Sequence, residues 1–219
     1  ATSMSHGGMY LGLRGTAEEL QLPKTNLWIY LDEHHDANVA ALRKDPSASL
    51  PLVYVSFPSA KDPDFQRRYP GRSTIEIVIG PCDFDSYRKW ADKTWGKRGD
   101  DYEALKVDLA ERMLEALFKQ MPHLRGKVDY YEVSTPLSTS HFCRYKQGEA
   151  YGLAHHRARF ESDWLKPKTS VPGLYLTGQD IISCGVVGAL MAGMVTAMSI
   201  VGVRGAAVML KNIKAGLTL

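Results

Sequence analysis

The residues best placed for chemistry lie in one short stretch of the last third of the chain. A predicted buried strand over 173–178 ends on Gly178, and two polar residues, Gln179 and Asp180, follow directly. The first turn of the next predicted helix is formed by Gly185, Val186, Val187 and Gly188. Such a turn has free N–H groups and the positive end of a helix dipole. The pattern therefore predicts a set of donors that could stabilise negative charge on a ligand.

A flavin is a ligand with this requirement. Its N1/C2=O edge becomes negative when the ring accepts a hydride, and glycines would let the backbone approach the flat ring closely. Gln179 and Asp180 could then hydrogen-bond the ribityl and phosphate linker. A glycine-rich core helix without any ligand explains the same spacing. On spacing alone both interpretations stay open.

An uncharged run of 23 residues, 181–203, follows Asp180. Its length suits a membrane span, which needs about 20 apolar residues. Ser183-Cys184-Gly185 interrupts its start, however, and further glycines dilute its hydrophobicity. We expect this helix to be covered by protein on most sides, with Gly188 and Ala189 against a strand or cofactor. A membrane helix rich in small residues is the alternative.

Composition excludes some classes of protein. The formal charge of +3 is small, and the 27 basic and 24 acidic residues are mixed along the chain, so no nucleic-acid-binding face is expected. Cys82, Cys143 and Cys184 lie far apart, which favours a reducing environment over a disulfide framework. The pairs His34-His35 and His155-His156 are adjacent residues that point apart, so we predict a structural or surface role and no metal.

The elements around this stretch predict an α+β fold. Strands are expected at 26–31, 52–57, 73–79 and 128–133, with helices at 37–44 and 83–93 and a surface loop at 59–72. The clearest helix follows Gly99, with Asp100 or Asp101 as its cap and Pro122 at its end. Thr135-Pro136 opens a loop or another helix. Three strands, a long helix and a further strand predict a mixed sheet with helices on one side.

Two segments near the C-terminus resemble a known family. Leu174-Tyr175-Leu176-Thr177-Gly178-Gln179-Asp180-Ile181 and Cys184-Gly185-Val186-Val187-Gly188-Ala189-Leu190 are similar to the C-terminal flavin motif of the retinol saturases. The carotenoid isomerases and bacterial phytoene desaturases are more distantly similar. Further stretches match the same family in the same order: 58–63, 70–74, 96–106 and 148–152.

The resemblance implies a division of the chain. Residues 1–170 would form mainly a substrate-binding domain, a mixed sheet with flanking helices. Residues 171–219 would be the C-terminal strand–helix segment of an FAD-binding, Rossmann-like domain. The family's GxGxxG unit, which holds the ADP part of FAD, has no counterpart in the chain. We therefore expect a piece of a longer protein that neither binds FAD tightly nor catalyses a reaction alone.

For the whole protein the resemblance implies an FAD-dependent oxidoreductase. It would reduce the 13,14 double bond of all-trans-retinol, or a related retinoid or polyene, with NAD(P)H as an electron donor. A carotenoid cis–trans isomerase or desaturase using the same flavin site is the alternative. The family places a loop at Tyr151 and Gly152 close to the flavin, which makes Tyr151 a candidate proton donor, although a packed tyrosine is more common. The resemblance also implies a membrane-associated protein of the endoplasmic reticulum.

Overall fold

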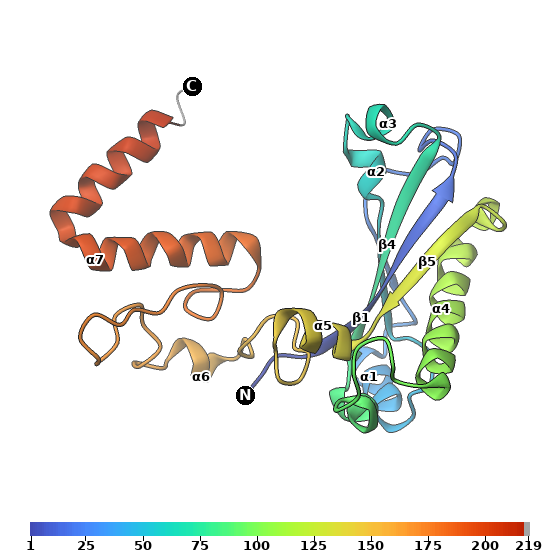
Figure 1. Ribbon diagram of the computed structural model, residues 1–219, viewed down its shortest axis with the longest axis horizontal. Coiled ribbons are helices and arrows are strands. Elements are labelled where there is room, and N and C mark those ends of the chain that lie inside the picture. The colour runs from blue at the N-terminus through green and yellow to red at the C-terminus, as the bar shows by residue number, and fades with distance from the viewer. Residues whose placement is uncertain (217–219) are drawn as a thin grey trace. The chain divides into compact units, whose positions relative to one another are not determined.

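The computed structural model describes residues 1–216, which divide into two compact units (Figure 1). The sheet unit contains Met4–Ala150. The helix unit contains Ala1–Ser3 and the chain from Tyr151 onward. This boundary falls earlier than the functional division predicted at residue 170, which stays a prediction.

The sheet unit is built on five strands in the order β2-β3-β4-β1-β5. They are β1 (Ser5–Arg14), β2 (Leu27–Tyr30), β3 (Leu52–Ser56), β4 (Arg72–Cys82) and β5 (Val128–Ser134). The α+β fold class and four of these strands agree with the sequence prediction. The predicted mixed sheet is wrong, because every neighbouring pair is antiparallel. β4 and β5 do run in the same direction, but β1 lies between them.

β1 was not predicted, although it holds the sheet together by pairing with both β4 and β5. Its glycines at positions 7, 8 and 12 resemble a turn-rich start. Met9, Leu11 and Leu13 nevertheless alternate in the way a half-buried strand requires, and each is at most 2% exposed. The alternation of these three side chains was the signal that could have identified the strand.

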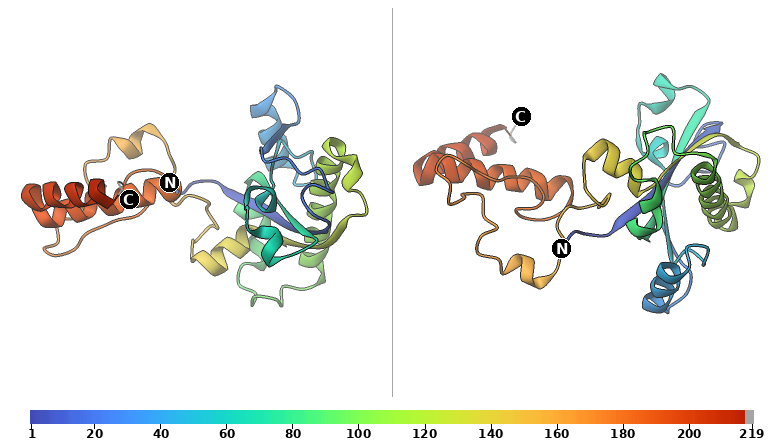
Figure 2. Two further views of the ribbon diagram at one scale, coloured as in Figure 1. Left: turned by 90° about the horizontal axis from the view of Figure 1, so that it is seen from above. Right: turned by 60° about the horizontal axis from the view of Figure 1, so that its bottom comes forward.

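The long helix α4 (Asp100–Gln120) covers one face of the sheet (Figures 1 and 2). Its buried residues Leu109, Ala110, Met113 and Leu117 pack into the core with side chains of the strands. The predicted cap is wrong: the N-cap is Gly99, and no side chain caps the helix. Asp101 instead accepts a hydrogen bond from Trp90 Nε1 at 3.0 Å.

Short helices complete the sheet unit. The helix α1 (His35–Lys44) agrees with prediction, and the predicted helix over 83–93 is a 3₁₀ helix, η1 (Phe84–Trp90). The predicted loop 59–72 contains two single-turn helices, α2 (Pro58–Lys61) and α3 (Phe65–Arg68). Near its C-terminal end the unit adds η2 (Pro122–Leu124) and α5 (Pro136–Cys143). Thr135 caps α5 and accepts a hydrogen bond from the Leu137 N–H.

The helix unit contains the short α6 (Arg157–Phe160) and the long α7 (Gly185–Gly216), which is kinked at Gly202 where φ is 69°. The buried strand predicted over 173–178 does not form in the described chain. Tyr175 makes an isolated bridge to Lys168, while Leu174 and Leu176 are 50% and 38% exposed. The apolar sequence of this segment therefore lacks a sheet to join.

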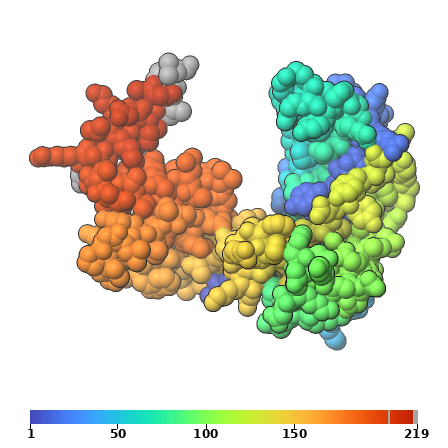
Figure 3. All heavy atoms as spheres, in the orientation of Figure 1, coloured from blue at the N-terminus to red at the C-terminus, as the bar shows by residue number. Residues whose placement is uncertain are grey.

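α7 is mostly uncovered in this chain, contrary to the expectation of burial on most sides. Its segment Gly185–Gly202 is long and apolar enough to cross a membrane by length and composition, and 17% of it is buried. Gly188, Ala192 and Thr196 form a buried stripe at a spacing of four residues. Thr196 Oγ1 donates to the Leu176 carbonyl at 2.9 Å. Several large apolar side chains of α7, which is the red part of Figure 3, are exposed, among them Val186, Leu190 and Ile200.

The position of β1 can be tested with two neighbouring residues that face opposite sides of the sheet. Leu11→Ala removes a core side chain and should lower the free energy of unfolding by about 2–5 kcal/mol. Tyr10→Ala changes a side chain that is 49% exposed and should cost about 1 kcal/mol or less. Urea unfolding of both variants measures the difference. Equal losses for the two would mean that β1 is not the buried central strand.

Candidate functional site

Two segments of the helix unit that contain predicted site residues lie against each other. The Asp180 carboxylate accepts the Leu153 N–H at 2.8 Å. Gly152 is buried beside it with a φ of +66°, and a Cβ atom at that position would lie 2.3 Å from Asp180 Oδ1. The loop can therefore approach the carboxylate only with glycine at position 152.

Gln179 also contacts the chain's own backbone. Its Oε1 accepts the Gly185 N–H at 3.4 Å, a long hydrogen bond to the residue that begins α7. Gly178 and Gly185 flank this turn with φ values of +97° and +84°, and neither has an atom within 4 Å of where a Cβ would be. The two polar residues predicted to reach a ligand thus also shape the turn in front of α7.

The first turn of α7 combines tight packing on one side with exposure on the other. A Cβ at Gly188 would lie 2.0 Å from the Ser183 carbonyl oxygen, so the chain folds closely over this glycine. Val186 and Val187 are 87% and 72% exposed. Because the first N–H groups of a helix have no acceptor within the helix, this turn can offer backbone donors to a ligand.

Tyr151 lies at the start of the same loop. Its N–H donates to Ser3 Oγ at 3.0 Å, which ties the loop to the first residues of the chain. Its side chain is half-exposed, so the phenol is accessible to a reacting group.

Two further residues of this site were not predicted. Arg159 is 6% exposed and donates to the carbonyl groups of Leu153 and Gln179. His155 Nε2 accepts the Cys184 N–H at 2.9 Å. The sequence predicts a structural or surface role for His155, and no spacing in it indicates which distant segments His155 and Arg159 join.

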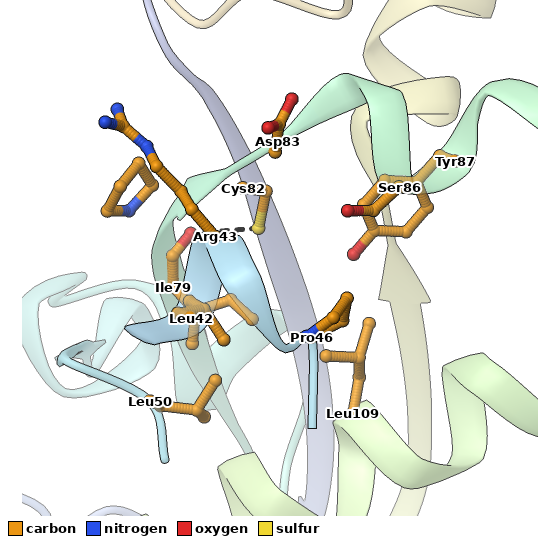
Figure 4. A pocket seen from close by; sticks show the side chains of 11 residues that line it. Leu42, Arg43, Pro46, Leu50, Ile79, Cys82, Asp83, Ser86, Tyr87 and Leu109 are labelled. Carbon is orange, nitrogen blue, oxygen red and sulfur yellow. Dashed lines mark hydrogen bonds between the residues drawn. The ribbon is translucent and has the colours of Figure 1, made fainter. Parts of the chain in front are cut away.

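The sheet unit contains a small cavity of about 40 Å³ near the end of β4 (Figure 4). It is too small for an organic ligand, since such pockets usually measure about 300–1,000 Å³. The Cys82 thiol lies at its wall, close to Tyr87. Burial raises the pKa of Cys82 to about 11 and also raises that of the Tyr87 phenol. In the described residues, no group of three or more His, Cys, Asp or Glu side chains is arranged to hold a metal ion.

The chain is similar over most of its length to oxidoreductases that act on a carbon–carbon double bond. It is 36% identical over 199 residues to the human protein named all-trans-retinol 13,14-reductase, and 35% identical over 199 residues to the rat protein of the same name. A zebrafish relative, 29% identical over 204 residues, is named inactive all-trans-retinol 13,14-reductase. The alignments with the human and rat proteins cover 88% of this chain and 32% of each relative. No family model matches the chain.

These similarities confirm the resemblance to the retinol saturases. The chain is homologous to a part of the all-trans-retinol 13,14-reductases and spans about a third of the length of the curated relatives it matches.

The close approach at Gly152 can be tested against a glycine of similar backbone conformation. Gly152→Ala should disrupt the Asp180 contact, since its Cβ would overlap the carboxylate. Gly173 has a φ of +79°, and no atom lies within 4 Å of where its Cβ would be. Gly173→Ala should therefore lower the free energy of unfolding only by the backbone penalty of about 1–2 kcal/mol. Hydrogen exchange at the Leu153 amide reports the contact. We expect much faster exchange in Gly152→Ala alone, and unchanged exchange there would contradict the geometry.

The raised pKa of Cys82 predicts low reactivity, because the thiolate is the nucleophilic form. At pH 8 the Cys82 thiol stays protonated. The Cys143 thiol, in contrast to that of Cys82, is open to solvent and to a labelling reagent. Pulse labelling with iodoacetamide, followed by peptide mass spectrometry, should modify Cys82 at least about tenfold more slowly than Cys143. Labelling of Cys82 at the same rate would show that its thiol is not buried in solution.

Proposed function

We propose that this chain forms about a third of an FAD-dependent oxidoreductase of the retinol saturase type. The whole protein would reduce the 13,14 double bond of all-trans-retinol or a related retinoid. The observation that carries the proposal is the similarity to proteins named all-trans-retinol 13,14-reductase, which covers 88% of the chain and includes the turn before α7.

The residues present fit the ring edge of a flavin. Gly178 and Gly185 leave open space at their Cα atoms, so a flat ring could approach the backbone there. The first turn of α7 supplies N–H donors and the positive end of the helix dipole, which suits an edge that becomes negative on reduction. The ADP part of FAD is bound by a GxGxxG turn in this family, and this chain contains no such sequence. We therefore assign only the ring-edge portion of the site to these residues.

Each residue of the site has a role in this proposal. Gln179 and Asp180 hold the turn and the Gly152 loop in place, and would border the ribityl and phosphate linker. The N–H groups of Val186 and Val187 would stabilise the negative ring edge, and the exposed side chains of these two valines would exclude water from it. Hydride for the double bond would come from bound, reduced FAD, with NAD(P)H as the electron donor.

Reduction of the double bond also requires a proton. The Tyr151 hydroxyl is our candidate donor, because Tyr151 begins the loop that carries Gly152 and its side chain is half-exposed. Solvent is the other source. Replacing Tyr151 with phenylalanine separates the two, since only a direct donor role lowers kcat.

The remaining parts of the chain have supporting roles. We assign residues 1–170 mainly to a substrate-binding domain that supplies an apolar tunnel for the retinoid, and residues 171–219 to the FAD-binding domain. The uncovered apolar surface of α7 would pack on other parts of the full-length protein, and its association with an endoplasmic reticulum membrane is the second way to cover it. The chain alone would bind FAD weakly and would be inactive.

The function is tested with the full-length protein, incubated anaerobically with FAD, a chemical reductant and all-trans-retinol. We expect a product that has gained two hydrogen atoms across the 13,14 bond, formed together with oxidation of the flavin. Isomerisation of a lycopene-type substrate without any reduced retinol would favour a carotenoid isomerase. Absence of turnover with FAD bound would place the protein beside the inactive zebrafish relative.

Two glycines of α7 allow a test of the flavin site. Gly188→Ala places a methyl group against the Ser183 carbonyl and should strip FAD from the full-length protein. Gly193→Ala lies in the same helix with nothing within 4 Å, and should retain the flavin. The ratio of flavin to protein after gel filtration measures the effect. A full flavin complement in Gly188→Ala would show that this turn does not border the cofactor.

A further inference from the structure

We propose that Arg159 is the positioning residue of the flavin site. In the structure its guanidinium joins the loop that carries Tyr151 and Gly152 to the turn formed by Gln179 and Asp180. We call the set Leu153, His155, Arg159 and Gln179 the Arg159 clamp. The link to a flavin rests on the proposed function, whereas the clamp itself rests on the contacts below.

Both backbone polar groups of Leu153, its carbonyl and its N–H, are held by side chains. Arg159 Nη1 donates to the Leu153 carbonyl at 3.0 Å, and Asp180 accepts the N–H of the same residue at 2.8 Å. Arg159 Nη2 donates to the Gln179 carbonyl at 2.7 Å. One side chain therefore fixes the distance between two segments more than 20 residues apart in sequence. Gly152 is held against Asp180 between these bonds.

His155 extends the clamp to the start of α7. Arg159 Nη1 lies 3.0 Å from His155 Nδ1 and 2.9 Å from His155 Nε2. The same Nε2 accepts the Cys184 N–H at 2.9 Å, one residue before α7 begins. Displacing the guanidinium would thus loosen both the Gly152 loop and the entry to the first turn of α7.

The charge of Arg159 is buried without a carboxylate partner in the described part of the chain. Its polar contacts are two carbonyl groups and an imidazole. Arg157, two residues earlier, is exposed and forms an ion pair with Glu161 at 2.6 Å. A buried cation held only by neutral acceptors favours negative charge nearby, which is what a reduced flavin develops. The planar fork also explains why arginine occupies the position, since a lysine cannot donate in two fixed directions.

The experiment compares Arg159→Lys and Arg159→Gln with Arg157→Gln in the full-length protein. The control removes an exposed arginine of the same helix and should behave as wild type. Both Arg159 variants should weaken FAD binding by about tenfold or more, because each loses hydrogen bonds from a charged donor. The flavin midpoint potential should become more negative in Arg159→Gln and change less in Arg159→Lys, which keeps the charge. Retinol turnover should fall in kcat more than it changes in KM.

Hydrogen exchange without flavin tests the clamp separately. The Leu153 and Cys184 amides should exchange faster in both Arg159 variants, while the sheet unit exchanges as in wild type. If exchange, FAD affinity and potential all match the Arg157→Gln control, the inference is overturned. If wild type binds no FAD but the Leu153 and Cys184 amides still exchange faster in the Arg159 variants, the proposed function is wrong and the Arg159 clamp is supported. Should Arg159→Gln not fold, Arg159→Lys carries the same comparison.

Discussion

The helix unit depends on one close approach, that of the Gly152 backbone to the Asp180 carboxylate. No side chain fits between them, and the left-handed conformation of Gly152 disfavours any other residue. The carboxylate is then directed at the Leu153 N–H, and Arg159 holds the opposite side of that residue. The unit has little apolar core of its own, so polar contacts of this kind determine where its loops lie. These polar contacts therefore also fix the positions of the residues in the proposed ring-edge site.

The sequence predicted the sheet unit well wherever side-chain patterns were local. Four strands and the long helix α4 follow from β-branched runs and from apolar spacing along a helix. The missing strand, β1, contains three glycines, and its omission also produced the wrong mixed sheet. With β1 absent, the order of three strands, a long helix and a further strand predicted a mixed sheet. With β1 between β4 and β5, the same helix joins two strands that do not touch.

The sequence predicted the glycines and polar residues of the candidate site. It did not predict the two side chains that hold them in place, Arg159 and His155. Asp180 and Gly188 stand out by type and spacing, whereas Gly152 was predicted from the family resemblance. The structure gives both glycines a steric reason to be glycine. Arg159 and His155 act across long sequence separations, where no periodicity indicates a partner. The strand expected before Gly178 failed for a related reason. A strand needs neighbouring strands, and in the described chain residues 174–176 make one isolated bridge, between Tyr175 and Lys168. The exposed surface of α7 also lacks a neighbouring segment in the described chain, and we propose that other parts of the full-length protein cover it.

We propose that the first turn of α7 borders the flavin ring. A crystal or cryo-EM structure of the full-length protein with FAD tests it directly. We expect the N1/C2=O edge of the ring to lie within hydrogen-bond distance of the N–H groups of Val186 and Val187, with the Gly152 loop and Arg159 placed as they are here. A ring bound elsewhere, with the first turn of α7 facing lipid or solvent, would show that this turn does not form the flavin site.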